Sequence, residues 1–271
     1  MDANRYSRQS FLGPTSQQII EETIIGVVGL GGGGSHIVQQ LAHIGFKNYV
    51  LYDRDVVEET NLNRLVGGKW KDVGNKTPKV KVSIRVISGL HRKKRIVAYQ
   101  SFWQENPEAL RQCDIVFGCV DGFSERQQLE AYCRRYLIPY IDIGMDVHAP
   151  KRPEDQPDMA GQVIVSMPGE PCMQCLTFLT PDKLQKEAGK YGAAGGTPQV
   201  VWPNGVLAST AVGFAMDILT GWTGQSPKTA WLSYRGNVGT LTPDTRLPYV
   251  IEKDCTHFLL VDVGLPVYKS L

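Results

Sequence analysis

The chain has 271 residues, of which 42% are hydrophobic and 21% are charged, and these are ordinary values for a soluble globular protein. Its formal net charge of +2 gives no reason to expect nonspecific binding to nucleic acid or to a membrane surface. No apolar run is long enough to span a bilayer, and the first residues lack the order of a signal peptide, so we expect a cytoplasmic protein.

The first half of the chain alternates predicted strands with predicted helices. After a polar arm over residues 1–14 and a short helix over 17–22, the pattern predicts, in order, strand 24–28, helix 34–44, strand 49–52, a helix opened by Pro78, strand 95–99, strand 114–119, helix 123–137 and strand 139–143. Alternation of this kind predicts an α/β fold with a doubly wound, mostly parallel Rossmann-like sheet.

The second half has a different character. Residues 145–160 are rich in proline and acidic residues and are expected to form an exposed excursion. The elements expected after it are strand 161–168, a weakly structured segment over 180–200, helix 204–219, and strands 229–234 and 237–241. No linker separates the halves, so we expect a single domain over 1–271 in which antiparallel strands extend the sheet. Its parts are an arm and helix over 1–22, a nucleotide-binding half over 23–144 and a second half over 145–271.

Five glycines follow the first predicted strand: Gly29, Gly31, Gly32, Gly33 and Gly34. Glycines let a backbone turn tightly and approach a phosphate closely, and the start of the next helix offers unpaired N–H groups. The second strand ends in Asp53, where a carboxylate can accept hydrogen bonds from ribose hydroxyls. The stretch therefore predicts a nucleotide site. Asp55 either shares this role or merely caps the turn.

Three polar residues follow in the long loop and at the next helix start: Asn61, Arg64 and Lys79. Each could be an ordinary surface residue. Together they place one amide and two cations beside the predicted phosphate cradle. Transfer of a phosphate group needs such cations against developing charge on oxygen, whereas nicotinamide chemistry does not.

Asp121 follows the predicted strand 114–119, at the same carboxyl edge of the sheet. It could cap the helix that starts near Phe123. It could equally hold Mg²⁺ on a triphosphate, and the pattern leaves both readings open.

Cys172 and Cys175 have the spacing of one half of a tetrahedral zinc site. The residues available for the other half are Cys255 and His257, whose spacing is unusual, and zinc is nevertheless favoured over an empty pair. A redox role is less expected because the pair does not open an evident helix. The remaining cysteines are expected in the core: Cys113, Cys119 and Cys133.

Several segments stand in a characteristic order over about residues 5–255: Arg5 to Gln9, the glycines from Gly29, Asp53 with Asp55, Asn61 to Arg64, Pro78 to Val80, Cys119 and Asp121 with Arg126, and Gly169 to Leu176. As a set they resemble the ubiquitin-activating-like adenylyltransferases of the ThiF/MoeB/HesA family. The resemblance implies ATP as cofactor. It also implies adenylation of the C-terminal glycine carboxylate of a small ubiquitin-like or sulfur-carrier protein, with release of pyrophosphate.

The resemblance also implies roles for individual residues. The glycines would cradle phosphate, Asp53 would hold ribose, and Asp121 would bind Mg²⁺. Contacts to the phosphates would come from Asn61, Arg64 and Lys79. Arg8 would reach into the site of a second subunit, which implies a homodimer. The carrier protein would lie on the second half of the sheet, and neither a membrane nor a nucleic acid is an expected partner.

The chain departs from the family pattern at three places. Gly122 stands where the family often has Asn, the second cysteine pair is incomplete, and residues 180–200 contain no cysteine. Many members carry a covalent acceptor cysteine in the corresponding loop. We therefore expect adenylation without a thioester on that segment.

Three alternatives remain open on the residues alone. The glycine stretch and Asp53 also suit an NAD(P)-dependent Rossmann oxidoreductase, although Arg64, Lys79, Asp121 and the cysteine pair are then unexplained. A tRNA-modifying member of the same superfamily is the second alternative. The third is an inactive scaffold that only binds the carrier.

Overall fold

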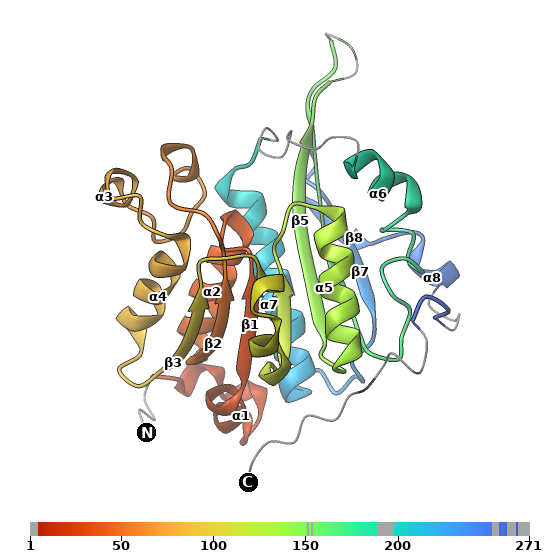
Figure 1. Ribbon diagram of the computed structural model, residues 1–271. Coiled ribbons are helices and arrows are strands. Elements are labelled where there is room, and N and C mark those ends of the chain that lie inside the picture. Colours follow the sequence, from red (N-terminus) through yellow and green to blue (C-terminus); the bar gives the residue numbers. More distant parts are fainter. Residues whose placement is uncertain are drawn as a thin grey trace.

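The computed structural model describes residues 5–150, 152, 154–188, 198–250, 255–258 and 264. Its strands are β1 (Ile24–Val28), β2 (Asn48–Tyr52), β3 (Arg95–Tyr99), β4 (Ile115–Gly118), β5 (Tyr140–His148), β6 (Asp158–Ser166), β7 (Ala230–Arg235) and β8 (Thr240–Pro243). They form one eight-stranded sheet in the order β3-β2-β1-β4-β5-β6-β7-β8 (Figure 1). The predicted doubly wound sheet with an antiparallel extension is confirmed.

The strand pairing changes once, at β5, from parallel to antiparallel. Strands β1 to β5 are parallel, with Ile25 of β1 opposite Tyr49 of β2 on one side and Ile115 of β4 on the other. From β5 onward the pairs β5–β6, β6–β7 and β7–β8 are antiparallel. The parallel strands are short, continuous apolar runs because helices cover them on both faces.

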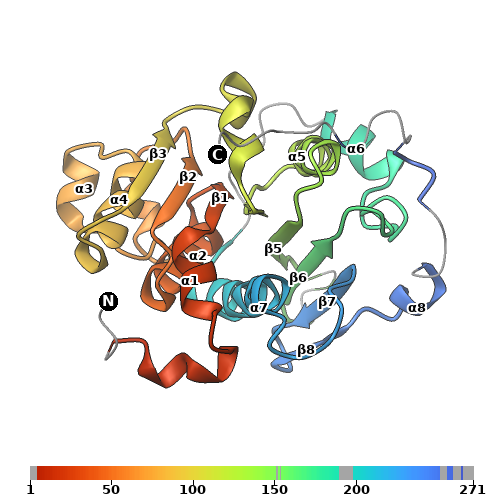
Figure 2. The ribbon, with the colours of Figure 1, turned by 90° about the horizontal axis from the view of Figure 1, so that it is seen from below.

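The helices lie in two layers. They are α1 (Ser16–Glu22), α2 (Gly32–Ile44), α3 (Trp70–Gly74), α4 (Lys79–Leu90), α5 (Phe123–Arg135), α6 (Pro181–Ala188), α7 (Val201–Thr220) and α8 (Leu247–Val250), with 3₁₀ helices η1 (Ser7–Leu12), η2 (Glu59–Asn61), η3 (Trp103–Glu105) and η4 (Pro107–Gln112). Figure 2 shows α2 and α7 on one face of the sheet and α5 on the other.

Each face has its own hydrophobic core. On one face, Ile37 and Leu41 of α2 pack with Leu207 of α7 against the sheet. On the other face, Leu129 and Cys133 of α5 belong to a second core that also contains Leu176, next to the cysteine pair. The loops that carry the predicted site residues are therefore attached to two packed layers. Helix α5 belongs to the second of these layers.

Two segments are more regular than the sequence pattern predicts. The expected excursion over 145–160 is largely a β-hairpin, because β5 continues to His148 and pairs there with Asp158 of β6. The hairpin stands out from the top of the sheet in Figure 1. The expected weakly structured segment 180–200 begins with the helix α6, and residues 189–197 lie outside the described part.

None of the helices in the described part of the chain is long and apolar enough to cross a membrane.

Candidate functional site

A cavity of about 320 Å³ opens where the parallel strands end, between the ends of β1, β2 and β4 and the middle of β5. Ligands bind at this edge in open α/β sheets, and the size is that of a small-molecule site. It is lined by most of the residues predicted from the sequence: Gly29, Gly31, Gly32, Gly33, Asp53, Asp55, Asn61, Arg64, Lys79 and Asp121. The fold therefore brings these residues together around one contiguous space.

Packing inside the protein gives most of these glycines a second reason, beside the predicted phosphate contact. A Cβ on Gly34 would lie 1.9 Å from the carbonyl oxygen of Gly29, and one on Gly32 would lie 2.6 Å from the amide of Asn204. Gly29 has a φ of +86°, and a Cβ there would lie 2.3 Å from the Cys119 carbonyl oxygen. Only at Gly31, among these, is there nothing within 4 Å. Packing inside the protein therefore requires most of these glycines, and Gly31 is the one that faces open space.

Asp53 joins the glycine turn to the end of β2. Its carboxylate accepts the backbone N–H of Leu30 at 2.7 Å and that of Asp55 at 2.8 Å. Burial raises the pKa of Asp53, and the nearby Lys79 acts in the opposite direction. Each carboxylate oxygen keeps acceptor capacity for a ligand hydroxyl, since it accepts only one of these bonds.

Lys79 is fixed by Asp55. The ammonium donates to the Asp55 carboxylate at 2.8 Å, and the Lys79 backbone N–H donates to the Asp55 carbonyl at 3.0 Å. The Lys79 side chain is 11% exposed. This long side chain has thus already lost most of its freedom and points a positive charge at the cavity.

Asn61 and Arg64 stand on the opposite rim from the sheet, in and after η2. The Asn61 side chain is buried and accepts the Glu58 N–H at 3.1 Å. Arg64 is half-buried and donates to the Thr60 carbonyl at 2.6 Å and to Asn63 at 2.9 Å. Asn61 is therefore a fixed part of the rim, and Arg64 is a half-buried cation beside it.

Asp121 lies exposed at the start of α5 and accepts a long hydrogen bond, 3.5 Å, from Gln199. The helix start beside it is occupied by Glu187 of α6, whose two carboxylate oxygens accept the N–H groups of Phe123 at 2.8 Å and Ser124 at 2.7 Å. A Cβ on Gly122 would lie 3.1 Å from Glu187 Oε1. Asp121 therefore does not cap α5, and Gly122 leaves room for the side chain that does.

Residues that the sequence analysis did not assign to the site also line the cavity, among them Glu125, Arg126, Gln199 and Asn204. Arg126 is buried and forms an ion pair with the fully buried Asp142. Burial raises the pKa of Asp142, and the Arg126 charge opposes that rise. Asn204 comes from the start of α7, far along the chain, and no local pattern marks it.

Arg8 lies outside this cavity. Its neighbour Gln9 donates to the carbonyl of Ile44, the last residue of α2, whereas the cavity is at the first turn of α2. A helix of 13 residues is about 20 Å long, so Arg8 stands roughly that far from the site within one chain.

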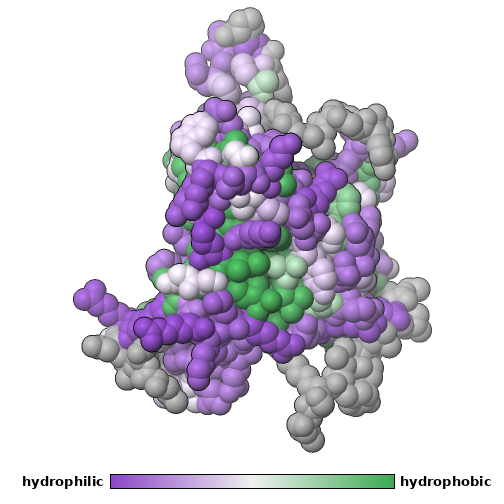
Figure 3. All heavy atoms as spheres, turned by 60° about the vertical axis from the view of Figure 1, so that its left-hand side comes forward, coloured by the Kyte–Doolittle hydropathy of each residue, from purple (hydrophilic) through white to green (hydrophobic). Residues whose placement is uncertain are grey.

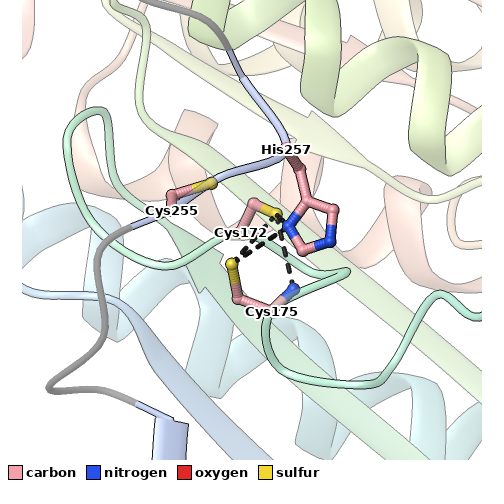
Figure 4. A group of neighbouring side chains, drawn as sticks. All are labelled: Cys172, Cys175, Cys255 and His257. Atoms are coloured by element: carbon pink, nitrogen blue, oxygen red, sulfur yellow. Dashed lines mark hydrogen bonds between the residues drawn. The ribbon is translucent and has the colours of Figure 1, made fainter.

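A second group of predicted residues meets on the other half of the molecule. The ligand atoms of Cys172, Cys175, Cys255 and His257 all lie within 4.8 Å of one another, and Figure 4 shows the four side chains converging. The Sγ atoms of Cys172 and Cys175 are 3.6 Å apart, and His257 Nδ1 lies 3.5 Å from the first and 3.2 Å from the second.

This cluster suits a tetrahedral metal ion. Zinc bonds of about 2.3 Å to sulfur and about 2.0 Å to nitrogen give edges of about 3.5–3.8 Å, near the distances found. Burial raises the pKa of the Cys172 and Cys175 thiols. Burial also opposes ionisation of Cys255, but hydrogen bonds from the His257 backbone and from the other two cysteines outweigh it and lower that pKa. The unusual spacing of Cys255 and His257 is no obstacle to a four-ligand arrangement.

Comparison with known proteins gives consistent matches. A model described as the ThiF family matches residues 4–254. The SAMP-activating enzyme E1 of Haloferax volcanii is 30% identical over 184 residues, which are 66% of this chain and 63% of that protein. The molybdopterin-synthase adenylyltransferase of Escherichia coli is 29% identical over 182 residues, 65% of this chain and 68% of the relative. The chain thus spans less than two thirds of the Haloferax protein.

Among solved structures, E. coli MccB superposes with a TM-score of 0.73 at 17% identity, covering 100% of this chain and 75% of that one. At this level of identity the likeness concerns the fold.

Proposed function

The chain belongs to the ThiF family, and from this premise we propose that it is an ATP-dependent adenylyltransferase. Its substrate would be the C-terminal glycine carboxylate of a small ubiquitin-like or sulfur-carrier protein. The relatives named above are an activating enzyme and an adenylyltransferase, which supports this class of reaction.

One observation carries the proposal. The side chains of Lys79, Asn61 and Arg64 line the same cavity as the first turn of α2 and Asp53. A helix start with free N–H groups and two cations is suited to a triphosphate. A nicotinamide cofactor needs no such concentration of positive charge around its reacting atoms.

The reaction itself is a substitution at phosphorus. An oxygen of the carrier carboxylate forms a bond to the α-phosphorus of ATP, and the bond from that phosphorus to the bridging oxygen of pyrophosphate breaks. The products are an acyl-adenylate and pyrophosphate, and no proton is taken up. A carboxylate is a weak nucleophile, so the site would act by positioning and by balancing charge on the phosphate oxygens.

In this proposal Lys79, pre-positioned by Asp55, and Arg64 contact the phosphates, and Asp53 holds the ribose. Asp121 is free to serve as the carboxylate that holds Mg²⁺, because Glu187 takes the capping role at α5. When bound, Mg²⁺ supplies further positive charge against the departing pyrophosphate.

Arg8 could act only in the site of a second copy, because it stands at the opposite end of α2 from its own cavity. Figure 3, with the α3–α4 side turned forward, shows an apolar area framed by hydrophilic residues. Independently of that view, the exposures of single residues place large hydrophobic side chains at the surface, among them Phe11 of η1, Val206 of α7 and Trp222 after α7. Exposed apolar area of this kind favours association, here as a homodimer.

Zinc at the cluster of Cys172, Cys175, Cys255 and His257 would be structural. All four ligand positions are filled by the protein, and a zinc ion that takes part in catalysis keeps one position open.

The decisive experiment is ATP–pyrophosphate exchange with purified small proteins that end in glycine. We expect exchange that depends on one such carrier and on Mg²⁺. Substitution Lys79→Met should lower the exchange rate by about 10²–10³-fold, the effect of losing one charge-stabilising group. Arg85→Met, which removes a cation paired with Asp72 away from the cavity, serves as control and should leave exchange near the wild-type rate.

Exchange that no carrier stimulates, together with ATP-dependent modification of a tRNA, would favour the tRNA-modifying alternative. The scaffold would be favoured if the wild-type protein catalysed no exchange and the Lys79→Met variant still bound the carrier.

A further inference from the structure

Helix α5 carries a buried ion pair near its C-terminal end, farther along the helix than the residues that line the cavity. Glu130 and Arg134 stand one helical turn apart, with Arg134 Nε 3.5 Å from Glu130 Oε1. Glu130 is 0% exposed and Arg134 is 3% exposed. Burying two charges costs free energy unless both are well paired and hydrogen bonded, so the contacts of this pair indicate what it holds in place.

The pair forms hydrogen bonds with the loop that carries Cys172 and Cys175. Arg134 donates from Nη1 to the Glu170 carbonyl and from Nη2 to the Pro171 carbonyl, each at 2.9 Å. Glu130 accepts the Met173 backbone N–H at 2.9 Å. Backbone groups on both sides of Cys172 are therefore bound to charged side chains of α5.

The same pair is tied to the sheet through Ser166, the last residue of β6. The Ser166 hydroxyl donates to Glu130 at 2.5 Å and accepts from Arg134 Nη2 at 2.8 Å. Because Ser166 is 1% exposed and belongs to a paired strand, it fixes the position of the guanidinium. The loop is thus anchored to the helix directly and to the sheet through Ser166.

Arg134 also touches the other half of the cluster. Its Cζ lies 5.2 Å from the centre of the Phe258 ring, the distance of a cation–π contact. Phe258 directly follows His257, which is 85 residues from Cys172 along the chain. One guanidinium therefore contacts the loop with Cys172 and Cys175 and the segment with Cys255 and His257.

We propose that Arg134 is the positioning residue of the metal-binding cluster. Its two carbonyl contacts set the orientation of the Cys172–Cys175 loop, and its contact with Phe258 draws the Cys255–His257 segment over that loop. Arg134 does not bind the metal. It makes the four ligands converge before the metal arrives, which lowers the ordering cost of binding.

The inference rests on the proposed zinc site but not on adenylation, so its test measures metal binding directly. The full chain is loaded with Zn²⁺, and its affinity is determined by competition with a chromophoric chelator. Arg134→Lys keeps the charge but lacks the planar fork that binds two carbonyls. We expect it to weaken zinc affinity by about 10–100-fold, the usual effect of losing a partner behind the ligands.

Two further variants guard against a general folding effect. Phe258→Leu removes the ring from Arg134 without leaving a buried charge, and we expect a severalfold loss of zinc affinity. Arg85→Lys is the matched control. Arg85 also pairs with a buried carboxylate, Asp72, and donates to a loop carbonyl, that of Gly67, but it does so away from the cluster.

Arg85→Lys should leave zinc affinity unchanged even if it lowers stability. Substitution with Co²⁺ gives a second readout, because its visible d–d bands report a tetrahedral site, and these bands should be altered in Arg134→Lys only. Zinc affinity within twofold of wild type in both Arg134→Lys and Phe258→Leu would overturn the proposal, as would a wild-type chain that binds no zinc. Pyrophosphate exchange, measured separately, decides the proposed function.

Discussion

The nucleotide-type cavity and the metal-binding cluster are built in opposite ways. The cavity is assembled at the ends of adjacent parallel strands, and its carboxylates come just after those strands, Asp53 after β2 and Asp121 three residues after the end of β4. The cluster is assembled from two segments about 80 residues apart, and charged side chains of α5 hold one of them against the other. Backbone topology makes the first site, and long-range side-chain contacts make the second.

The difference predicts different weaknesses. A site made by backbone topology is disrupted by any added side-chain atom that clashes with the backbone. A site made by side-chain contacts tolerates local change but depends on its ligand and on its anchors. Substitutions and metal removal can test this contrast, and the strongest effect is expected at the glycine turn.

Gly34→Ala should be the most damaging single change to the cavity. Its Cβ would lie 1.9 Å from the Gly29 carbonyl oxygen, so the turn or α2 must move. We expect a loss of stability of about 3 kcal/mol or more, at the upper end for overpacking, measured by urea denaturation.

Gly31→Ala is the matched control, because a Cβ there meets nothing within 4 Å and φ is −74°. It should fold with near-normal stability, yet weaken ATP binding in calorimetry, since its methyl group would face the cavity. Equal destabilisation by both changes would contradict the assignment of Gly31 to the open side.

Removal of metal from the cluster should cost less than Gly34→Ala and should be reversible. With zinc at a hundredfold excess over its Kd, bound metal stabilises by about 2.7 kcal/mol. For a chain of this size that corresponds to about 5–10 °C in Tm. A strong chelator should lower Tm by this amount in calorimetry and added Zn²⁺ should restore it. Cys172→Ser should make the chelator ineffective.

Gly122→Asn tests the boundary between the two regions. The added side chain crowds Glu187, which caps α5 from α6. Loss of a helix cap costs about 1 kcal/mol, and we expect this loss of stability together with faster tryptic cleavage at Lys183 and Lys186. The double variant with Glu187→Ala should be no less stable than Glu187→Ala alone. If the losses of stability in the two single variants added fully in the double variant, Gly122→Asn would not act through the Glu187 cap.

Acid stability gives a small contrast, similar in size to that of Gly122→Asn. Hydrogen bonds and charge from Arg246 hold the pKa of Asp244, after β8, at about 2, below its usual value near 3.8. The folded state therefore gains stability from ionised Asp244 above pH 4, and this gain is lost as pH falls from about 4 to 2. The gain is about 1–2 kcal/mol after allowance for solvent screening at the half-exposed Arg246.

Asp244→Asn should lower stability at pH 7 by that amount and should remove the corresponding slope between pH 4 and 2. Burial acts in the opposite sense on Asp53, whose pKa is raised. Ionised Asp53 is thus tolerated in the cavity at a cost, whereas ionised Asp244 strengthens the antiparallel half. Denaturation curves across this pH range, with and without the substitution, measure the difference.

The sequence predicts the parallel half well because its signals are local. Apolar runs mark β1, β2 and β4. Glycines follow β1, and Asp53 and Asp121 follow β2 and β4, so parallel topology alone carries these residues to one edge. Lys79 could be added to them because the long loop that leaves this edge leads to the start of α4. The packing reason for the glycines could not be read, since Gly32 and Gly34 meet Asn204 and Gly29 only in the folded chain.

The antiparallel half is less predictable because its signals are long-range. Beyond Ile143, Met145 and Val147 lie on one face of β5 and Asp146 and His148 on the other, so the alternation of a strand continues to His148. It is short, and the proline- and acid-rich residues that follow it predict an excursion there. The spacing of Cys172 and Cys175 suggested a metal, but Arg134 and Glu130 showed no pattern that linked them to it. Their role follows from a contact between α5 and a distant loop.

The β5–β6 hairpin lends itself to engineering. Ala160 is the last β6 residue that pairs with β7, and Met159 still packs against one core, so the pair of His148 with Asp158 is the one that lies beyond the packed sheet. Both His148 and Asp158 are exposed, so this end of the ribbon lies outside both cores. A peptide tag or reporter inserted between β5 and β6 would project away from the protein. The length of this connection can therefore change while the cavity and the cluster stay intact.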